Sequence, residues 1–265
     1  MSGATSRGAG ILGFFLGMIL AGGIYFCGAV LLGATLMTAA IIATVAGMIG
    51  AAYSATAFSK SIYSVGAFSI LGYLLDMSWS LLNTLAALLV WTPACKIVGA
   101  NFIPPNRDSR RSGTFVYDKN PRGGGYDATT IGTLIAGGWS SHEETHVWQA
   151  RIFGPSYMLA YILALILNIP FRLITGHTRN LTMEAYYRIP FEDWAYGAGS
   201  TSGSDINWRW WFLGLLLALI YTVALISIPV GLVLGRFTLW GTGAVVLSGY
   251  SAIRAVLPGR HRGRH

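Results

Sequence analysis

The chain has 265 residues, of which 54% are hydrophobic and only 11% are charged, and its formal net charge is +8. A soluble domain usually carries about 25% charged residues, so the composition excludes an ordinary soluble protein and indicates an integral membrane protein whose partner is the lipid bilayer. The basic residues flank apolar runs, as at Arg254 and in the arginine-rich C-terminus. This arrangement predicts contact with anionic lipid and argues against nucleic acid as a partner.

The N-terminal segment, residues 1–98, is predicted to form glycine-rich hairpins. Residues 11–57 carry no charge, and at about 20 residues per crossing they predict two transmembrane helices that turn near Gly33. Gly13 and Gly17 form a small-xxx-small pair, which predicts close packing within this hairpin. The alternative is that these glycines join the chain to a second copy or to another membrane protein.

Residues 61–95 are predicted to form a re-entrant or angled hairpin, because Asp76 divides them into apolar runs of 15 and 19 residues. The nearest basic residues in sequence, Lys60 and Lys96, lie at the far ends of these runs. We therefore expect Asp76 at an interfacial turn, without a buried ion pair and with little effect on stability. An Asp76 at membrane depth would instead favour a channel or transporter.

Residues 99–209 are predicted to form a small extramembrane α+β module, because they hold ten of the eighteen Lys and Arg and nine of the ten Asp and Glu. Residues 114–118 and 128–138 are rich in Thr, Ile and Val and are bounded by turn residues, so they predict short strands. The expected fold is mainly α: a polytopic helical membrane protein with this module.

The sequence His142-Glu143-Glu144-Thr145-His146 is an H-E-x-x-H motif. A predicted capping box of Ser141 and Glu144 places it at the start of a helix, where residues four apart share one face. His142 and His146 are therefore expected to direct both imidazoles at one Zn²⁺ ion, with Glu143 as general base. The alternatives are a surface helix with paired histidines and a decayed motif that binds no metal.

A third zinc ligand must come from elsewhere in the chain. The candidates are Glu184, Glu192, Asp193, Asp205 and His177. Residues 184–197 hold the two preferred ones, Glu192 and Glu184.

The stretches HEETHVWQARIFGPSYMLAY and YYRIPFEDWAY resemble a group of bacterial H-E-x-x-H membrane proteins of gluzincin-like type, over about residues 138–197. The resemblance implies zinc ligation by two histidines of one helix and a glutamate of another, which are His142, His146 and Glu192 here. The matching positions are His142, Glu143, His146, Gln149, Gly154, Pro155, Pro190, Phe191, Glu192 and Tyr196. The chain departs from the pattern at Ile189 and Trp194, where Asn and a second acid are more usual.

The uncharged residues 152–171 lie between the motif and Glu192. Gly154-Pro155 and Pro170 are expected to limit the helix to residues 156–169, about 21 Å long and shorter than the roughly 30 Å hydrocarbon core. We therefore expect a helix that dips into the membrane, so that all three ligands lie on one side.

The C-terminal segment, residues 210–265, is predicted to be a transmembrane hairpin, residues 210–235 and 237–253, followed by a basic tail. The distribution of Lys and Arg places both termini and residues 99–209 in the cytoplasm, with the bacterial inner membrane as the expected location.

The sequence favours a membrane-embedded zinc metallopeptidase acting near the membrane surface. Oxyanion donors could be Tyr187, Arg188, Tyr196 or His177. Two alternatives remain: a non-catalytic structural or assembly subunit with a bracing metal site, and a channel or transporter built around Asp76.

Overall fold

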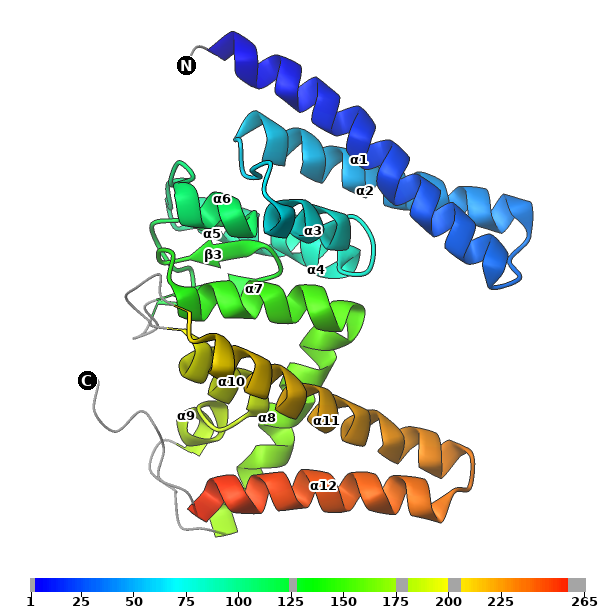
Figure 1. The fold of residues 1–265 in the computed structure, drawn as a ribbon, viewed down its shortest axis with the longest axis vertical. Coiled ribbons are helices and arrows are strands. Elements are labelled where there is room, and N and C mark those ends of the chain that lie inside the picture. The colour runs from blue at the N-terminus through cyan, green and yellow to red at the C-terminus, as the bar shows by residue number, and fades with distance from the viewer. Residues whose placement is uncertain (1–2, 124–127, 175–180, 200–205, 257–265) are drawn as a thin grey trace. The chain divides into compact units, whose positions relative to one another are not determined.

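The computed structural model describes residues 3–123, 128–174, 181–199 and 206–256 and is mainly helical (Figure 1). The chain divides into two compact units, Met1–Pro155 and Ser156–His265, so the 99–209 segment contributes elements to both. The α-helices of the first unit are α1 (Gly3–Leu31), α2 (Leu36–Ser59), α3 (Ala67–Asp76), α4 (Leu81–Ala86), α5 (Thr92–Ile97), α6 (Arg107–Ser112) and α7 (Ser141–Phe153), and a π-helical turn, Ala87–Trp91, joins α4 to α5. Those of the second are α8 (Tyr157–Ile174), α9 (Leu181–Tyr186), α10 (Pro190–Ala198), α11 (Trp208–Val233) and α12 (Phe237–Val256).

Four helical stretches within the described residues are long and apolar enough to cross a membrane: Arg7–Leu31, Leu36–Ser59, Ser141–Ile174 and Trp208–Val233. A fifth is added if the bent pair at Ala67–Asp76 and Leu81–Ile97 counts as one span. The expected crossing at 237–253 forms α12, which is not among the four. These helices support the expectation of a membrane protein.

Helices α1 and α2 form the predicted hairpin. The turn contains Gly33 at φ 85°, and the Thr35 hydroxyl caps α2 by accepting a hydrogen bond from the backbone N–H of Thr38. A Cβ added to Gly17 would lie 2.2 Å from the carbonyl oxygen of Gly50, so the glycines allow the two backbones to approach closely. The predicted packing within the hairpin is therefore confirmed.

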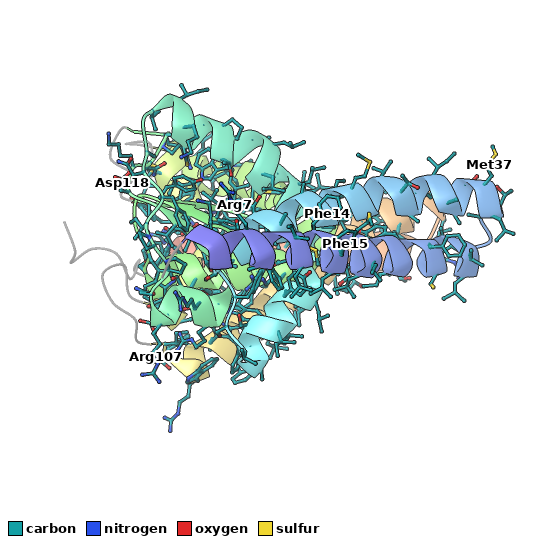
Figure 2. The ribbon with its side chains drawn as sticks, turned by 90° about the horizontal axis from the view of Figure 1, so that it is seen from above. Arg7, Phe14, Phe15, Met37, Arg107 and Asp118 are labelled. Carbon is teal, nitrogen blue, oxygen red and sulfur yellow. The ribbon has the colours of Figure 1, made fainter. Side chains whose placement is uncertain are left out.

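The surface of the α1–α2 hairpin is apolar. Phe14, Phe15 and Met37 are all exposed, and Met37 lies at the tip, far from the charged side chains of Arg7 and Asp118 (Figure 2). An exposed apolar surface of this kind suits contact with lipid tails.

The expectation for Asp76 is wrong. Helices α3 and α4 do bend at this position, by 83°, but Asp76 is fully buried and its Oδ1 and Oδ2 accept hydrogen bonds from Arg151 Nε and Nη2 at 3.0 and 2.7 Å. The Tyr63 hydroxyl donates a hydrogen bond to Oδ2 at 2.6 Å. Burial, and then the charge of Asp76, raise the pKa of Tyr63 well above its usual range, so the hydroxyl keeps the proton that it donates. The partner was missed because it lies 75 residues downstream, on α7.

Trp79, in the turn between α3 and α4, and Asn83, in the first turn of α4, cap the C-terminus of α7. Asn83 Nδ2 donates to the carbonyl oxygens of Ala150 and Gly154 at 2.9 and 2.7 Å, and Trp79 Nε1 donates to that of Ile152 at 3.0 Å. The last carbonyls of a helix have no partners within the helix. These side chains therefore fix α7 in place while satisfying groups that burial would otherwise leave unpaired.

The sheet of the first unit has three short strands, β1 (Phe115–Tyr117), β2 (Thr129–Ile131) and β3 (Leu134–Ala136), in the order β1-β3-β2. β1 runs parallel to β3, whereas β2 runs antiparallel to it. Both predicted strand segments are confirmed, but 128–138 is a hairpin rather than one strand. Its turn contains Gly132 at φ 57°, where an added Cβ would lie 2.2 Å from the carbonyl oxygen of Asn83.

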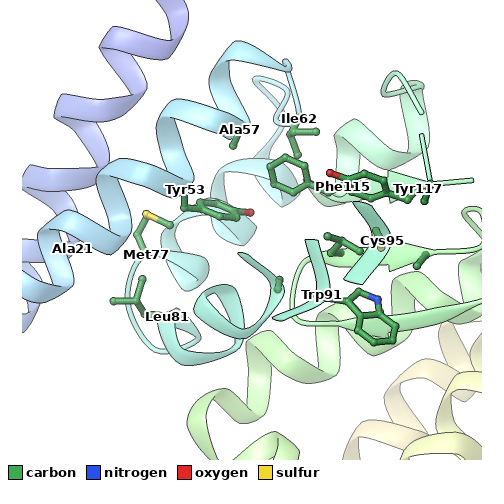
Figure 3. Packing of buried hydrophobic residues seen from close by; sticks show 14 of the residues in the cluster. Ala21, Tyr53, Ala57, Ile62, Met77, Leu81, Trp91, Cys95, Phe115 and Tyr117 are labelled. Carbon is green, nitrogen blue, oxygen red and sulfur yellow. The ribbon is translucent and has the colours of Figure 1, made fainter. Parts of the chain in front are cut away.

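The core of the first unit joins α2 and the bent α3–α4 pair to the sheet (Figure 3). The Tyr53 and Phe115 rings pack edge to face at 5.7 Å, and the Tyr53 hydroxyl lies 2.6 Å from that of Tyr63 and 3.2 Å from that of Thr133. The contact between Tyr53 and Thr133 ties the β2–β3 hairpin to α2.

In the second unit, the predicted helix end before Pro170 is wrong, because α8 continues through Pro170 to Ile174. Its 18 residues span about 27 Å. In apolar surroundings, ending a helix leaves more backbone groups unsatisfied than the single hydrogen bond lost at a proline. Helices α11 and α12 form the predicted C-terminal hairpin. Trp194 of α10 packs directly against Gly214 of α11, where an added Cβ would lie 2.3 Å from the Trp194 side chain.

Candidate metal centre

The H-E-x-x-H motif lies in the first turns of α7, as predicted, but the cap differs from the expected one. Ser140, not Ser141, is the N-cap, and its hydroxyl accepts a hydrogen bond from the backbone N–H of Glu143 at 3.2 Å. Glu144 does not cap the helix with its side chain and instead pairs with Arg111 at 3.2 Å. The cap starts the helix one residue before the first histidine.

The two histidines of the motif face each other. His142 Nε2 and His146 Nε2 are 3.2 Å apart, and the ring planes stand at 85°. Both residues are buried, with 3% and 6% of their surface exposed. The four-residue spacing has therefore brought two imidazole nitrogens to one point.

This separation fits a shared metal ion. Two nitrogens bound to a tetrahedral zinc at about 2.05 Å would be about 3.3 Å apart, compared with the 3.2 Å found between His142 and His146. The separation of the two nitrogens is therefore close to that of a zinc-bound pair.

Gln149 orients the second histidine. Its side-chain Oε1 lies 2.9 Å from His146 Nδ1, and Gln149 is fully buried. An amide oxygen only accepts hydrogen bonds, so this contact favours the tautomer with the proton on His146 Nδ1 and a lone pair on Nε2. This is the tautomer that a metal requires at Nε2.

Glu143 lies beside the histidine pair and is held by the sheet. Its Oε1 is 4.0 Å from His142 Nε2, while Oε2 accepts a hydrogen bond of 2.6 Å from the Thr130 hydroxyl of β2. The sequence identified Glu143 but not Thr130, and no signal short of the strand register would have found it.

The acids of 184–197 are distinguished by their partners within the second unit. Glu192, on the first turn of α10, is fully buried, and the Tyr161 hydroxyl of α8 donates to its Oε1. Glu184 forms an i,i+4 pair with Arg188 at 3.7 Å and its side chain is 39% exposed. Burial therefore favours Glu192 over Glu184 as a ligand.

The other residues considered from sequence are used differently or lie elsewhere. Asp193 accepts a hydrogen bond from Tyr250 and pairs with Arg254, which occupies both of its oxygens. The rings of Tyr187 and Tyr196 pack against each other at 5.9 Å, and Arg188 donates to the backbone carbonyl of Arg254. His177 and Asp205 lie outside the described residues.

His142 and His146 of the first unit and Glu192 of the second are all buried, and imidazole and carboxylate are groups that can bind a metal ion. No protein-family model, curated protein or solved structure matches the chain.

Proposed function

We propose that the chain is a membrane-embedded zinc metallopeptidase. The observation that carries this proposal is the 3.2 Å approach of His142 Nε2 to His146 Nε2 on one buried helix, with the carboxylate of Glu143 beside them. A paired-histidine helix serving only to pack α7 would not need this acid next to the nitrogens.

Three side chains would hold the ion: His142, His146 and Glu192. A catalytic zinc site has three protein ligands of this kind and one open position. Support for Glu192 comes from the resemblance of its Pro-Phe-Glu element, from its burial, and from the engagement of Glu184 with Arg188. When bound, zinc would supply the Lewis acidity that makes water nucleophilic near neutral pH.

Glu143 would move the proton. Its carboxylate would accept a proton from the attacking water and pass it to the leaving amine of the peptide bond. The substrate class is a peptide segment near the membrane surface, delivered to the N-terminal end of α7.

We further propose a topology for this enzyme: an inner bacterial membrane, with the polar end of the first unit in the cytoplasm. In that unit, Arg7, Arg107 and Asp118 lie at the end opposite the apolar tip at Met37 (Figure 2). The excess of basic residues on that end supports a cytoplasmic placement. In this proposal, residues 99–209 form a zincin-like module.

A second candidate is a structural or assembly subunit. The observation that favours it is the fixation of α7 at its C-terminal end by Asn83, Trp79 and the Asp76–Arg151 pair, which a bracing metal at the other end would complement. The channel or transporter alternative is weaker, because the carboxylate of Asp76 is closed on both oxygens by Arg151 and Tyr63.

The two candidates differ in what Glu143→Gln does. In the purified protein, with quenched fluorescent casein as probe, we expect wild-type cleavage to be lost in Glu143→Gln while bound zinc is retained. Glu144→Gln is the matched control, since Glu144 pairs with Arg111, and should keep most of the activity. Zinc without any casein cleavage in the wild type would favour the structural subunit.

A further inference from the structure

Thr130 makes the most direct contact between the sheet and the proposed general base. Its Oγ1 lies 2.6 Å from Glu143 Oε2 and 3.4 Å from the backbone carbonyl of Glu143. A threonine hydroxyl has one proton to donate, and the shorter distance shows that it donates to the carboxylate. Glu143 Oε2 is therefore held by a hydrogen bond from Thr130 of β2.

The other oxygen of Glu143 faces the histidines. Oε1 is 4.0 Å from His142 Nε2, and the side chain is only 9% exposed. A carboxylate this close to a bound metal could itself become a ligand after a rotation of its side chain. A ligand in that position would close the open site and remove the base.

The strand that carries Thr130 is fixed. Thr130 pairs with Ile135 in the antiparallel ladder of β2 and β3, and the hydroxyl of Thr133, in the turn of this hairpin, lies 3.2 Å from the Tyr53 hydroxyl. The sheet and the contact with Tyr53 hold the strand of Thr130 in place, so the Thr130 hydroxyl is already positioned to restrain Glu143.

We propose that Thr130 is a positioning residue that holds Glu143 away from the metal and so keeps the fourth coordination position open. This inference rests on the proposed function, since it presupposes a metal on His142 and His146. It adds a specific role for a hydroxyl outside the H-E-x-x-H motif: Thr130 determines whether Glu143 is a base or a ligand.

The test uses full-length protein loaded with Co²⁺, whose visible spectrum reports the ligands around the metal, and sodium azide as a probe of the open position. We expect azide to bind wild type and Thr130→Ser alike, and to bind Thr130→Val about tenfold more weakly, in line with the loss of one hydrogen bond to a charged group. Thr129→Val is the matched control: Thr129 accepts from Asn120 rather than contacting Glu143, and the same change there should leave azide binding unchanged.

A Glu143→Ala background shows whether Thr130 acts through Glu143. There, Thr130→Val should have no further effect on azide binding. Equal azide affinity of Thr130→Val and wild type would overturn the inference, as would loss of cobalt binding in Thr130→Val or an undiminished effect in the Glu143→Ala background. If wild type binds cobalt but no azide, the open site and the inference both fail; if it binds no cobalt, the proposed function itself fails.

Discussion

The buried pair of Asp76 and Arg151 provides the sharpest test of the fold. Both side chains are 0% exposed, and Arg151 contacts the carboxylate through Nε and Nη2 and the carbonyl oxygens of Ser112 and Gly113 through Nη1 and Nη2. The change Asp76→Asn keeps the shape of the side chain but leaves the guanidinium of Arg151 buried without its counter-charge.

The cost of this change follows from burial. Removing one partner of a fully buried pair costs about 3–5 kcal/mol, because the remaining charge is desolvated and uncompensated. Against a typical total of roughly 5–15 kcal/mol, Asp76→Asn should remove about a fifth or more of the free energy of unfolding. The double change Asp76→Asn with Arg151→Met removes both charges and should recover part of that loss.

The assay is equilibrium unfolding in detergent micelles, followed by tryptophan fluorescence. The control is Asp118→Asn, at an exposed acid that accepts hydrogen bonds from Asn101, and it should unfold much closer to the wild-type midpoint than Asp76→Asn. If Asp76→Asn lowers the free energy of unfolding by less than about 1 kcal/mol, the size usual for a surface substitution, the buried pair is not what holds α3 to α7.

Two further changes test the packing of the hairpin and the orientation of His146. Gly17→Ala should destabilise the hairpin by about 1–3 kcal/mol, as overpacking does, because its Cβ would lie 2.2 Å from the carbonyl oxygen of Gly50. Gly23→Ala is the control, since its Cβ would have nothing within 4 Å, and equal unfolding midpoints of the two variants would contradict the close approach. Gln149→Leu should lower zinc affinity about 10–100-fold, because it removes the hydrogen-bond acceptor at His146 Nδ1. A competitive chelator titration measures this affinity, and an unchanged value would show that Gln149 does not orient His146.

Local signals in the sequence predicted much of this fold. The uncharged run at 11–57 with its glycines predicted the α1–α2 hairpin. The turn was predicted near Gly33, and in the structure Gly33 has the positive φ that glycine adopts readily. The four-residue spacing of His142 and His146 predicted their shared face. Each of these properties depends on neighbours within about one helical turn or one hairpin.

The features that the sequence did not reveal depend on distant partners. Asp76 could not be paired with Arg151 without knowing that α7 packs against the bend between α3 and α4. Thr130 became relevant only through the register that sets β2 beside Glu143. Pro170 was expected to end a helix by its local chemistry, but apolar surroundings favour keeping the helix continuous.

Elemental analysis of the purified protein tests most directly the proposal that His142, His146 and Glu192 would hold zinc. We predict one zinc per chain in the wild type and in Glu184→Gln, with strongly reduced zinc in His146→Asn and in Glu192→Gln. Retention of zinc by Glu192→Gln together with its loss from Glu184→Gln would contradict the assignment of the third ligand. A wild-type protein without zinc, or zinc that survives His146→Asn, would contradict the metal centre itself.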